Sequence, residues 1–155
     1  MRKDIMRFLC AAIALLVLGG VGTIGCSKCS SGIVDPSCNS TETFLLVVPP
    51  SPNDGSSISF SGHAFTVSNN GEYFVTLNTL TPPLAGNLGT HVQVTAQAGG
   101  QCVPNLQKVN EAFGTAGKQI LSGVFTQPGT YCVFVLDTLR TFPAEETASV
   151  TVNHP

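Results

Sequence analysis

Six cysteines and three histidines are the residues of this 155-residue chain that could support redox, metal or acid–base chemistry. Cys26 and Cys29 form a C-x-x-C pair, which a thioredoxin-like redox site would place between a strand and a helix. An apolar segment precedes this pair, and a segment rich in Ser, Gly and Pro follows it. We therefore expect no redox chemistry there. No second C-x-x-C or paired histidine follows, so the sequence assigns no metal ligand.

The candidate acid–base groups are His63, His91 and His154. None of them belongs to a G-x-S-x-G, H-E-x-x-H or EF-hand motif, and no acidic residue recurs at a fixed spacing from them. We expect all three histidines, and the Glu145–Glu146 pair, to be exposed to solvent. The sequence therefore predicts no catalytic residue, no cofactor and no enzymatic activity.

The N-terminal segment has the pattern of a secretory signal. Residues 1–7 are basic, residues 8–21 are apolar, and the run is shorter than the ~20 residues that span a bilayer. Residues 23–26, Thr-Ile-Gly-Cys, resemble the bacterial lipobox, in which the Cys is lipidated and becomes the mature N-terminus. We predict a lipoprotein-type signal peptide over 1–25 and a lipid anchor at Cys26 that holds the protein in the cell envelope, at the outer membrane or the cell surface. Ordinary secretion is the alternative, because Thr23 stands where the lipobox has an aliphatic residue.

The remaining cysteines predict disulfides. Cys10 would leave with the signal peptide, and Cys26 would carry lipid. The mature chain keeps four others: Cys29, Cys38, Cys102 and Cys132. Three pairings are open to them, and local pairing would join the first two to each other and the last two to each other. Export provides the oxidising compartment, and closing the longer loop would stabilise the fold by about 3.5 kcal/mol.

Residues 26–41 read as a flexible linker, and 42–155 as a single β-domain. In the second segment, short apolar runs alternate with turn residues, and the expected strands are 43–48, 58–61, 65–67, 72–77, 91–97, 119–126, 130–136 and 147–152. Seven or eight strands without any β-α-β rhythm predict an all-β fold, an antiparallel β-sandwich, and exclude Rossmann and TIM architectures.

Two segments carry more specific expectations. In the strand 91–97, Val92 and Val94 should face the core, while His91, Gln93, Thr95 and Gln97 should face solvent. Residues 105–117 have apolar side chains three and four apart, which suits a short amphipathic helix, but an irregular loop between the sheets explains the segment equally well.

Four strand motifs suggest a family. Phe-Thr-Val at 65–67, Glu-Tyr-Phe-Val-Thr-Leu at 72–77, Gln-Pro-Gly-Thr-Tyr-Cys-Val-Phe-Val at 127–135 and Ser-Val-Thr-Val at 149–152 resemble the bacterial pre-peptidase C-terminal domain. The resemblance covers 58–155 and implies a jelly-roll-like sandwich that accompanies secreted enzymes or stands on surface proteins. Members of this family are not catalytic, and they bind polymers or assist secretion.

Composition narrows the range of partners. The chain is 43% hydrophobic and 10% charged, which excludes intrinsic disorder. Its net charge is −2, and from Cys26 onward four basic residues face eight acidic ones, so no nucleic acid is expected as a partner. We expect a non-catalytic exported binding or accessory module with a protein or polysaccharide ligand, contacted through loops 82–90 and 137–146. The alternative is a structural or assembly component of the envelope that pairs with another protein.

Overall fold

The computed structural model describes residues 39–84 and 89–155. The predicted signal peptide over 1–25, the lipid anchor at Cys26 and the Cys29–Cys38 pairing lie outside the described residues. So does the predicted linker, apart from its last three positions. Within the described residues, no helix has the length and apolar character needed to cross a membrane.

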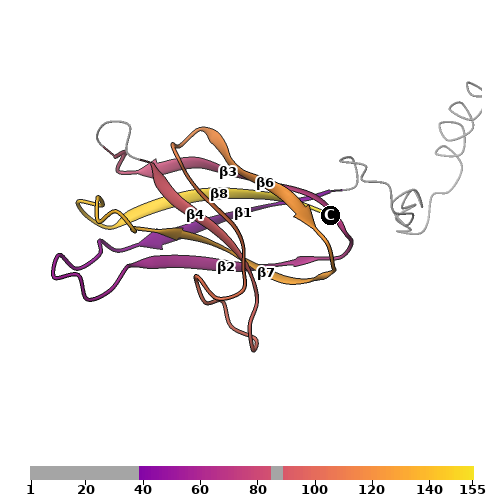
Figure 1. The fold of residues 1–155 in the computed structure, drawn as a ribbon. Coiled ribbons are helices and arrows are strands. Elements are labelled where there is room, and N and C mark those ends of the chain that lie inside the picture. The colour runs from indigo at the N-terminus through magenta and orange to yellow at the C-terminus, as the bar shows by residue number, and fades with distance from the viewer. Residues whose placement is uncertain (1–38, 85–88) are drawn as a thin grey trace, which may run out of the picture. The chain divides into compact units, whose positions relative to one another are not determined.

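The described chain forms eight strands in two four-stranded sheets (Figure 1). Their bounds are β1 Ser40–Val48, β2 Phe60–Val67, β3 Gly71–Thr81, β4 Thr90–Ala96, β5 Lys108–Gly114, β6 Lys118–Phe125, β7 Gly129–Leu136 and β8 Glu146–His154. The first sheet has the order β1-β8-β3-β6 and the second the order β2-β7-β4-β5. Every pairing is antiparallel, which confirms the predicted all-β sandwich.

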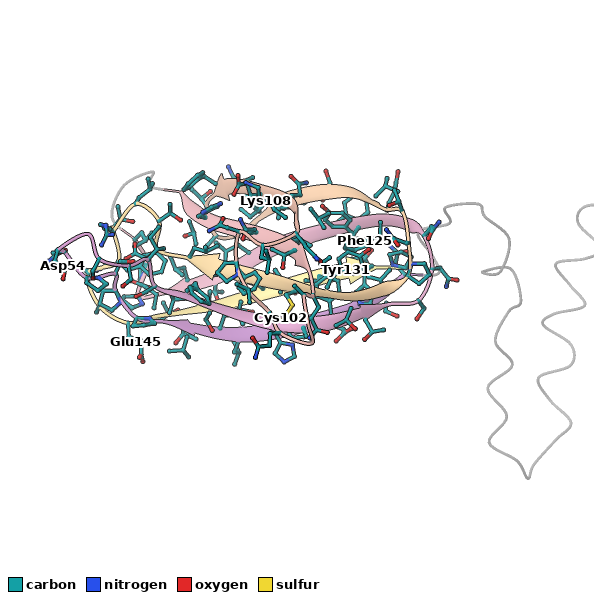
Figure 2. All side chains as sticks on the ribbon, turned by 60° about the horizontal axis from the view of Figure 1, so that its bottom comes forward. Asp54, Cys102, Lys108, Phe125, Tyr131 and Glu145 are labelled. Atoms are coloured by element: carbon teal, nitrogen blue, oxygen red, sulfur yellow. A yellow bond between two sulfur atoms is a disulfide. The ribbon has the colours of Figure 1, made fainter. Side chains whose placement is uncertain are left out.

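The strand order is that of a jelly roll. β1 pairs with β8, β2 with β7, β3 with β6 and β4 with β5, so the first and second halves of the chain run beside each other as one folded ribbon. Because successive strands reverse direction, the β1–β2 and β7–β8 loops meet at one end of the sandwich. Asp54 and Glu145 mark these two loops in Figure 2.

The core lies between the two sheets and is built from alternate residues of each strand. Tyr73, Val75 and Leu77 of β3 are buried, as their alternation predicts. Phe125 stacks on Tyr73 and lies 4.2 Å, centroid to centroid, from the ring of Tyr131 (Figure 2). These rings join the last residues of β6 to the start of β7, so the turn between the two strands is fixed by aromatic packing.

The segment 105–117 is neither a helix nor a loop over its central part, because Lys108–Gly114 forms β5 and pairs with β4. Its inward positions carry Asn110, Ala112 and Gly114, whereas Val109 and Phe113 point outward. Small residues on the inward face of an edge strand leave an apolar spacing of three and four on the outside. The same spacing is typical of a short amphipathic helix, which is why the sequence suggested one.

The polar residues of β4 point away from the core but are not exposed. Gln93 and Thr95 are fully buried, and His91 is only 7% exposed. The β4–β5 loop, 97–107, folds back over the outside of the second sheet, where the backbone N–H of Asn105 donates to Oε1 of Gln93 in β4 (2.7 Å). The expectation that these side chains face solvent is therefore wrong, because a loop covers the sheet on its outer side.

Cys102 anchors that covering loop. Its sulfur lies at disulfide-bonding distance from the sulfur of Cys132 in β7, with the two Cα atoms 5.7 Å apart (Figure 2). This is the pairing that the sequence predicts for the second two cysteines of the mature chain. Cys132, Phe134 and Leu136 form a small apolar cluster outside the main core, and Cys102 packs against it. The second sheet is thus packed on both of its faces.

Candidate functional site

Four side chains cross the outer face of the second sheet in register. Phe60 of β2 lies opposite Leu136 of β7, Leu136 opposite His91 of β4, and His91 opposite Phe113 of β5. We call Phe60, Leu136, His91 and Phe113 the aromatic row. Leu136 and His91 are buried in its middle, while Phe60 and Phe113 are 44% and 51% exposed at its ends. The row therefore presents the aromatic rings of Phe60 and Phe113 to solvent, one at each end.

His91 is fixed by three contacts. Its Nδ1 lies 2.7 Å from Oγ1 of Thr138, its Nε2 lies 3.1 Å from Oε2 of Glu111, and its ring stacks on Phe113 with centroids 4.5 Å apart. A carboxylate only accepts hydrogen bonds, so Nε2 carries a proton; in the neutral ring, Nδ1 accepts from the Thr138 hydroxyl. His91 is thus buried and its ring is fixed in orientation, whereas the sequence predicts an exposed histidine.

Glu111 links this histidine to the covering loop. Lys108 lies 2.5 Å from its Oε1, and the Gln93 amide donates to its Oε2 at 3.1 Å. The hydrogen bond from Lys108 is the main reason that the pKa of Glu111 lies below its usual value, with a further contribution from Gln93. Gln93 also exchanges two hydrogen bonds with Asn105, at 2.9 and 2.7 Å. One connected polar network therefore holds both the loop and the aromatic row.

The order Thr138 hydroxyl, His91 imidazole, Glu111 carboxylate is that of a nucleophilic relay. Here, however, the carboxylate is also bound to Gln93 and Lys108, and the imidazole is covered by Phe113. Through its stacking on His91, the Phe113 ring is joined to this network. Among the described residues, no three His, Cys, Asp or Glu side chains come together as metal ligands.

A groove of about 420 Å³ opens beside the Phe113 end of the row, between β5 and β6. Its lining residues are Gly89, Phe113, Gly114, Thr115, Lys118, Gln119 and Ile120. Phe113 thus borders both the aromatic row and this groove. Lys118 supplies the positive charge and Gln119 an amide, so the groove adds polar contacts to an apolar surface.

The other two histidines lie apart from this surface. His63 is exposed, as predicted, and its ring stacks on Phe44 at 4.2 Å. His154 is buried, contrary to prediction, and its Nε2 lies 2.9 Å from Oε1 of Glu42. The burial follows from the inward phase of β8, whose alternate residues up to His154 face the core. The structure therefore does not gather the three histidines into one site.

The Glu145–Glu146 pair is divided between solvent and core. Glu145 is exposed, but Glu146 begins β8 on its inward phase and is fully buried. Neither of its carboxyl oxygens has a hydrogen-bond partner among the described residues. Burial, and secondarily the nearby Asp137, raises the pKa of Glu146 above its usual value. The prediction of a solvated pair is therefore wrong for Glu146.

The loop 137–146, between β7 and β8, is held in place by hydrogen bonds to the carboxylate of Asp137. Asp137 is buried and accepts backbone N–H groups from Ser51, Thr141 and Phe142 at 2.8 to 3.2 Å. A carboxylate with three such donors holds the β1–β2 and β7–β8 loops together. This loop also places Thr138 beside His91, and its contact with a ligand stays a prediction. Residues 85–88 of the other candidate loop lie outside the described residues.

Sequence reasoning missed Glu111, Phe113 and Thr138 as partners of His91. The available signal was the alternation of small and large residues from Lys108 to Gly114, which is a strand pattern once the amphipathic-helix interpretation is set aside. Nothing in the spacing places Thr138 beside His91, because the two residues are 47 positions apart.

Comparison with known proteins leaves the family open. No protein-family model matches the chain, and no curated protein matches its sequence. The resemblance to the pre-peptidase C-terminal domain therefore stays a prediction from four strand motifs, and the jelly-roll fold rests on the structure alone.

Proposed function

We propose that the protein is a non-catalytic binding module of the bacterial cell envelope, exported by its N-terminal segment and anchored through a lipid on Cys26. The basic and apolar pattern of residues 1–21 supports export. The Cys102–Cys132 pairing supports an oxidising compartment. A small sandwich with a packed core and a disulfide suits a domain that has to remain folded outside the cell.

The observation that carries the binding role is the aromatic row. Phe113 is half exposed, yet its ring is held by a buried histidine that has hydrogen bonds on both nitrogens. Holding an exposed aromatic ring in place lowers the entropic cost of binding against it. Aromatic faces stack on sugar rings and also serve as hot spots in protein interfaces. The proposed ligand is accordingly an envelope polysaccharide or protein bound across the row.

The test is binding by the wild-type chain, Phe113→Ala and Phe60→Ala, with Val124→Ala as a matched control. Val124 is exposed on the outer face of the other sheet, where β3 pairs with β6. We expect wild type and the control to bind insoluble envelope polysaccharide, or to co-purify with a cross-linked envelope protein, and both Phe variants to lose this binding. Equal binding by all four proteins, or none by wild type, would refute the proposal.

The Thr138–His91–Glu111 order gives one reason to test for hydrolysis as well. Purified protein is expected to leave ester, peptide and glycoside substrates uncleaved. Turnover that disappears in both His91→Ala and Thr138→Ala would show an enzyme in place of a binding module. The same outcome with retained ligand binding would show that the two roles coexist.

A further inference from the structure

β1 exposes two large apolar side chains on the outer face of the first sheet. Leu45 is 73% exposed and Val47 is 46% exposed, while Phe44, Leu46 and Val48 between and beside them face the core. Leu45 and Val47 are consecutive outward positions, so they lie side by side along the strand. Scattered apolar residues on a surface are ordinary, but an adjacent pair on a sheet edge is a docking feature.

β1 is an edge strand of the described sheet. It is hydrogen-bonded to β8 on one side, and β2 on its other side belongs to the second sheet. The contact between β1 and β2 includes the stacked rings of Phe44 and His63. Among the described residues, the backbone of β1 is hydrogen-bonded only to β8, so the N–H and C=O groups on its other side are available to an added strand.

The other three edge strands are β2, β5 and β6. β2 contains Gly62, which weakens a strand, and β5 and β6 carry features that discourage strand addition. β6 begins with Lys118, and its Ser122 carbonyl accepts a hydrogen bond from the Asn110 amide at 3.0 Å. β5 carries the Lys108–Glu111 ion pair. Residues 43–48 of β1 have no charge, no Pro and no Gly. Charged residues and blocked backbone groups are the usual protection of sheet edges, and this stretch of β1 has neither.

We propose that the protein forms a symmetric dimer in which β1 pairs antiparallel with β1 of a second copy. A two-fold axis at Leu46 places Leu45 of each copy opposite Val47 of the partner subunit, so both exposed side chains become cross-strand pairs. Two identical charged strands would repel each other, but this segment is uncharged. The surface is therefore complementary to itself.

The geometry also limits the assembly to two copies. Pairing through the same edge of both copies uses up that edge, and Pro49–Pro50 ends the ladder directly after Val48. The joined sheet then has β6 at both of its edges, where Lys118 and the Asn110 cap oppose further addition. A closed dimer results, and Phe113 of the aromatic row lies on β5, the strand of the second sheet farthest from β2.

The experiment measures mass in solution by light scattering after size-exclusion chromatography. It uses the full exported chain with Cys26→Ser, so that no lipid drives association. We expect a dimer at micromolar concentration and a dissociation constant raised at least roughly tenfold by Leu45→Lys or Val47→Lys, since a lysine ammonium would lose hydration between the strands. Val124→Lys is the matched control, because Val124 is 54% exposed on the outer face of β6 in the same sheet.

A monomeric wild type, or equal weakening by Leu45→Lys and Val124→Lys, would overturn the proposal. Circular dichroism checks that each variant is folded. Hydrogen exchange supplies an independent measurement. Slower exchange of the β1 amides at higher protein concentration supports the dimer, and an exchange rate that does not depend on protein concentration contradicts it. Neither result depends on whether the aromatic row binds a ligand.

Discussion

At the scale of single residues, the buried Glu146 carboxyl is the group with the clearest energetic consequence. It lies on the inward phase of β8 without a hydrogen-bond partner among the described residues, near the Asp137 carboxylate. Burial in apolar surroundings disfavours the charged form, so the folded protein holds the Glu146 proton more tightly than the unfolded chain does. The structure tolerates this group at a cost that depends on pH.

The sign of that dependence follows from linkage. Below the usual pKa of 4.5, Glu146 is protonated in both states, and its contribution to stability is fully present. As pH rises, the unfolded chain loses the proton first, so the free energy of unfolding falls until pH reaches the raised pKa of the folded state. We therefore expect Glu146→Gln to remove this fall and to be more stable than wild type above that pH.

Urea unfolding of Glu146→Gln across a pH series measures this effect. Glu145→Gln is the matched control, because it removes the same charge from an exposed neighbouring position. The control should keep the pH dependence of wild type. If both variants behave alike, net charge accounts for the dependence and the burial of Glu146 does not.

At the scale of elements, the β4–β5 loop decides what the outside of the second sheet becomes. The loop is held by the Cys102–Cys132 pair and by the Gln93–Asn105 hydrogen bonds. Asn105 has φ +64°, a left-handed conformation that Asn adopts more readily than most residues. Because these contacts hold the loop 97–107 against the outer face of the second sheet, side chains on that face are packed. The alternation in the strand alone predicts that they are exposed to solvent.

Replacing both Cys102 and Cys132 with Ala is expected to lower the free energy of unfolding by about 3.5 kcal/mol without abolishing the fold. The main core keeps its packing because neither cysteine belongs to it. Hydrogen exchange should become faster in the 97–107 loop and stay slow in β3 and β8.

Val103→Ala serves as the comparison, since it shortens an exposed side chain in the same loop. It should leave exchange in the loop close to that of wild type. Free thiols at Cys102 and Cys132 in protein folded in an oxidising compartment would contradict the pairing. Uniformly faster exchange in every strand of the double variant would mean that the disulfide supports the whole sandwich.

At the scale of the whole molecule, the jelly-roll topology pairs strands that are far apart in the sequence. β1 and β8 pair across the full length of the domain, and Thr43 bonds to Thr151 over 108 positions. Ordering such contacts requires closing long loops first, so folding is slow compared with that of helical bundles. We expect refolding in milliseconds to seconds with the disulfide intact.

Stopped-flow tyrosine fluorescence can follow this process directly. The chain has two tyrosines and no tryptophan, and Tyr73 and Tyr131 are both buried against Phe125. The signal therefore reports closure of the core between the two sheets. Refolding in microseconds would show that local structure, and not the β1–β8 pairing, limits the rate.

The fold class and most strands can be predicted from local patterns in the sequence. Alternation of apolar residues in β3 and β8, Asn-Gly and Pro-Gly turns, and the absence of any helix-strand repeat were enough, because these signals are local and each strand carries its own pattern. The Cys102–Cys132 pairing was also readable, since local pairing was the simplest arrangement of the cysteines.

Which polar residues are buried, and which of them contact one another, depends on packing between distant segments of the chain. His91 and Thr138 come together because β4 and β7 are neighbours in the second sheet, and Gln93 is buried because a loop returns over it. Glu146 is buried because β8 begins two residues before Ala148, which puts Glu146 on the same inward face as the apolar residues of the strand. A strand's periodicity tells which way a side chain points. It does not tell what covers that side chain, because the covering segment comes from a distant part of the chain.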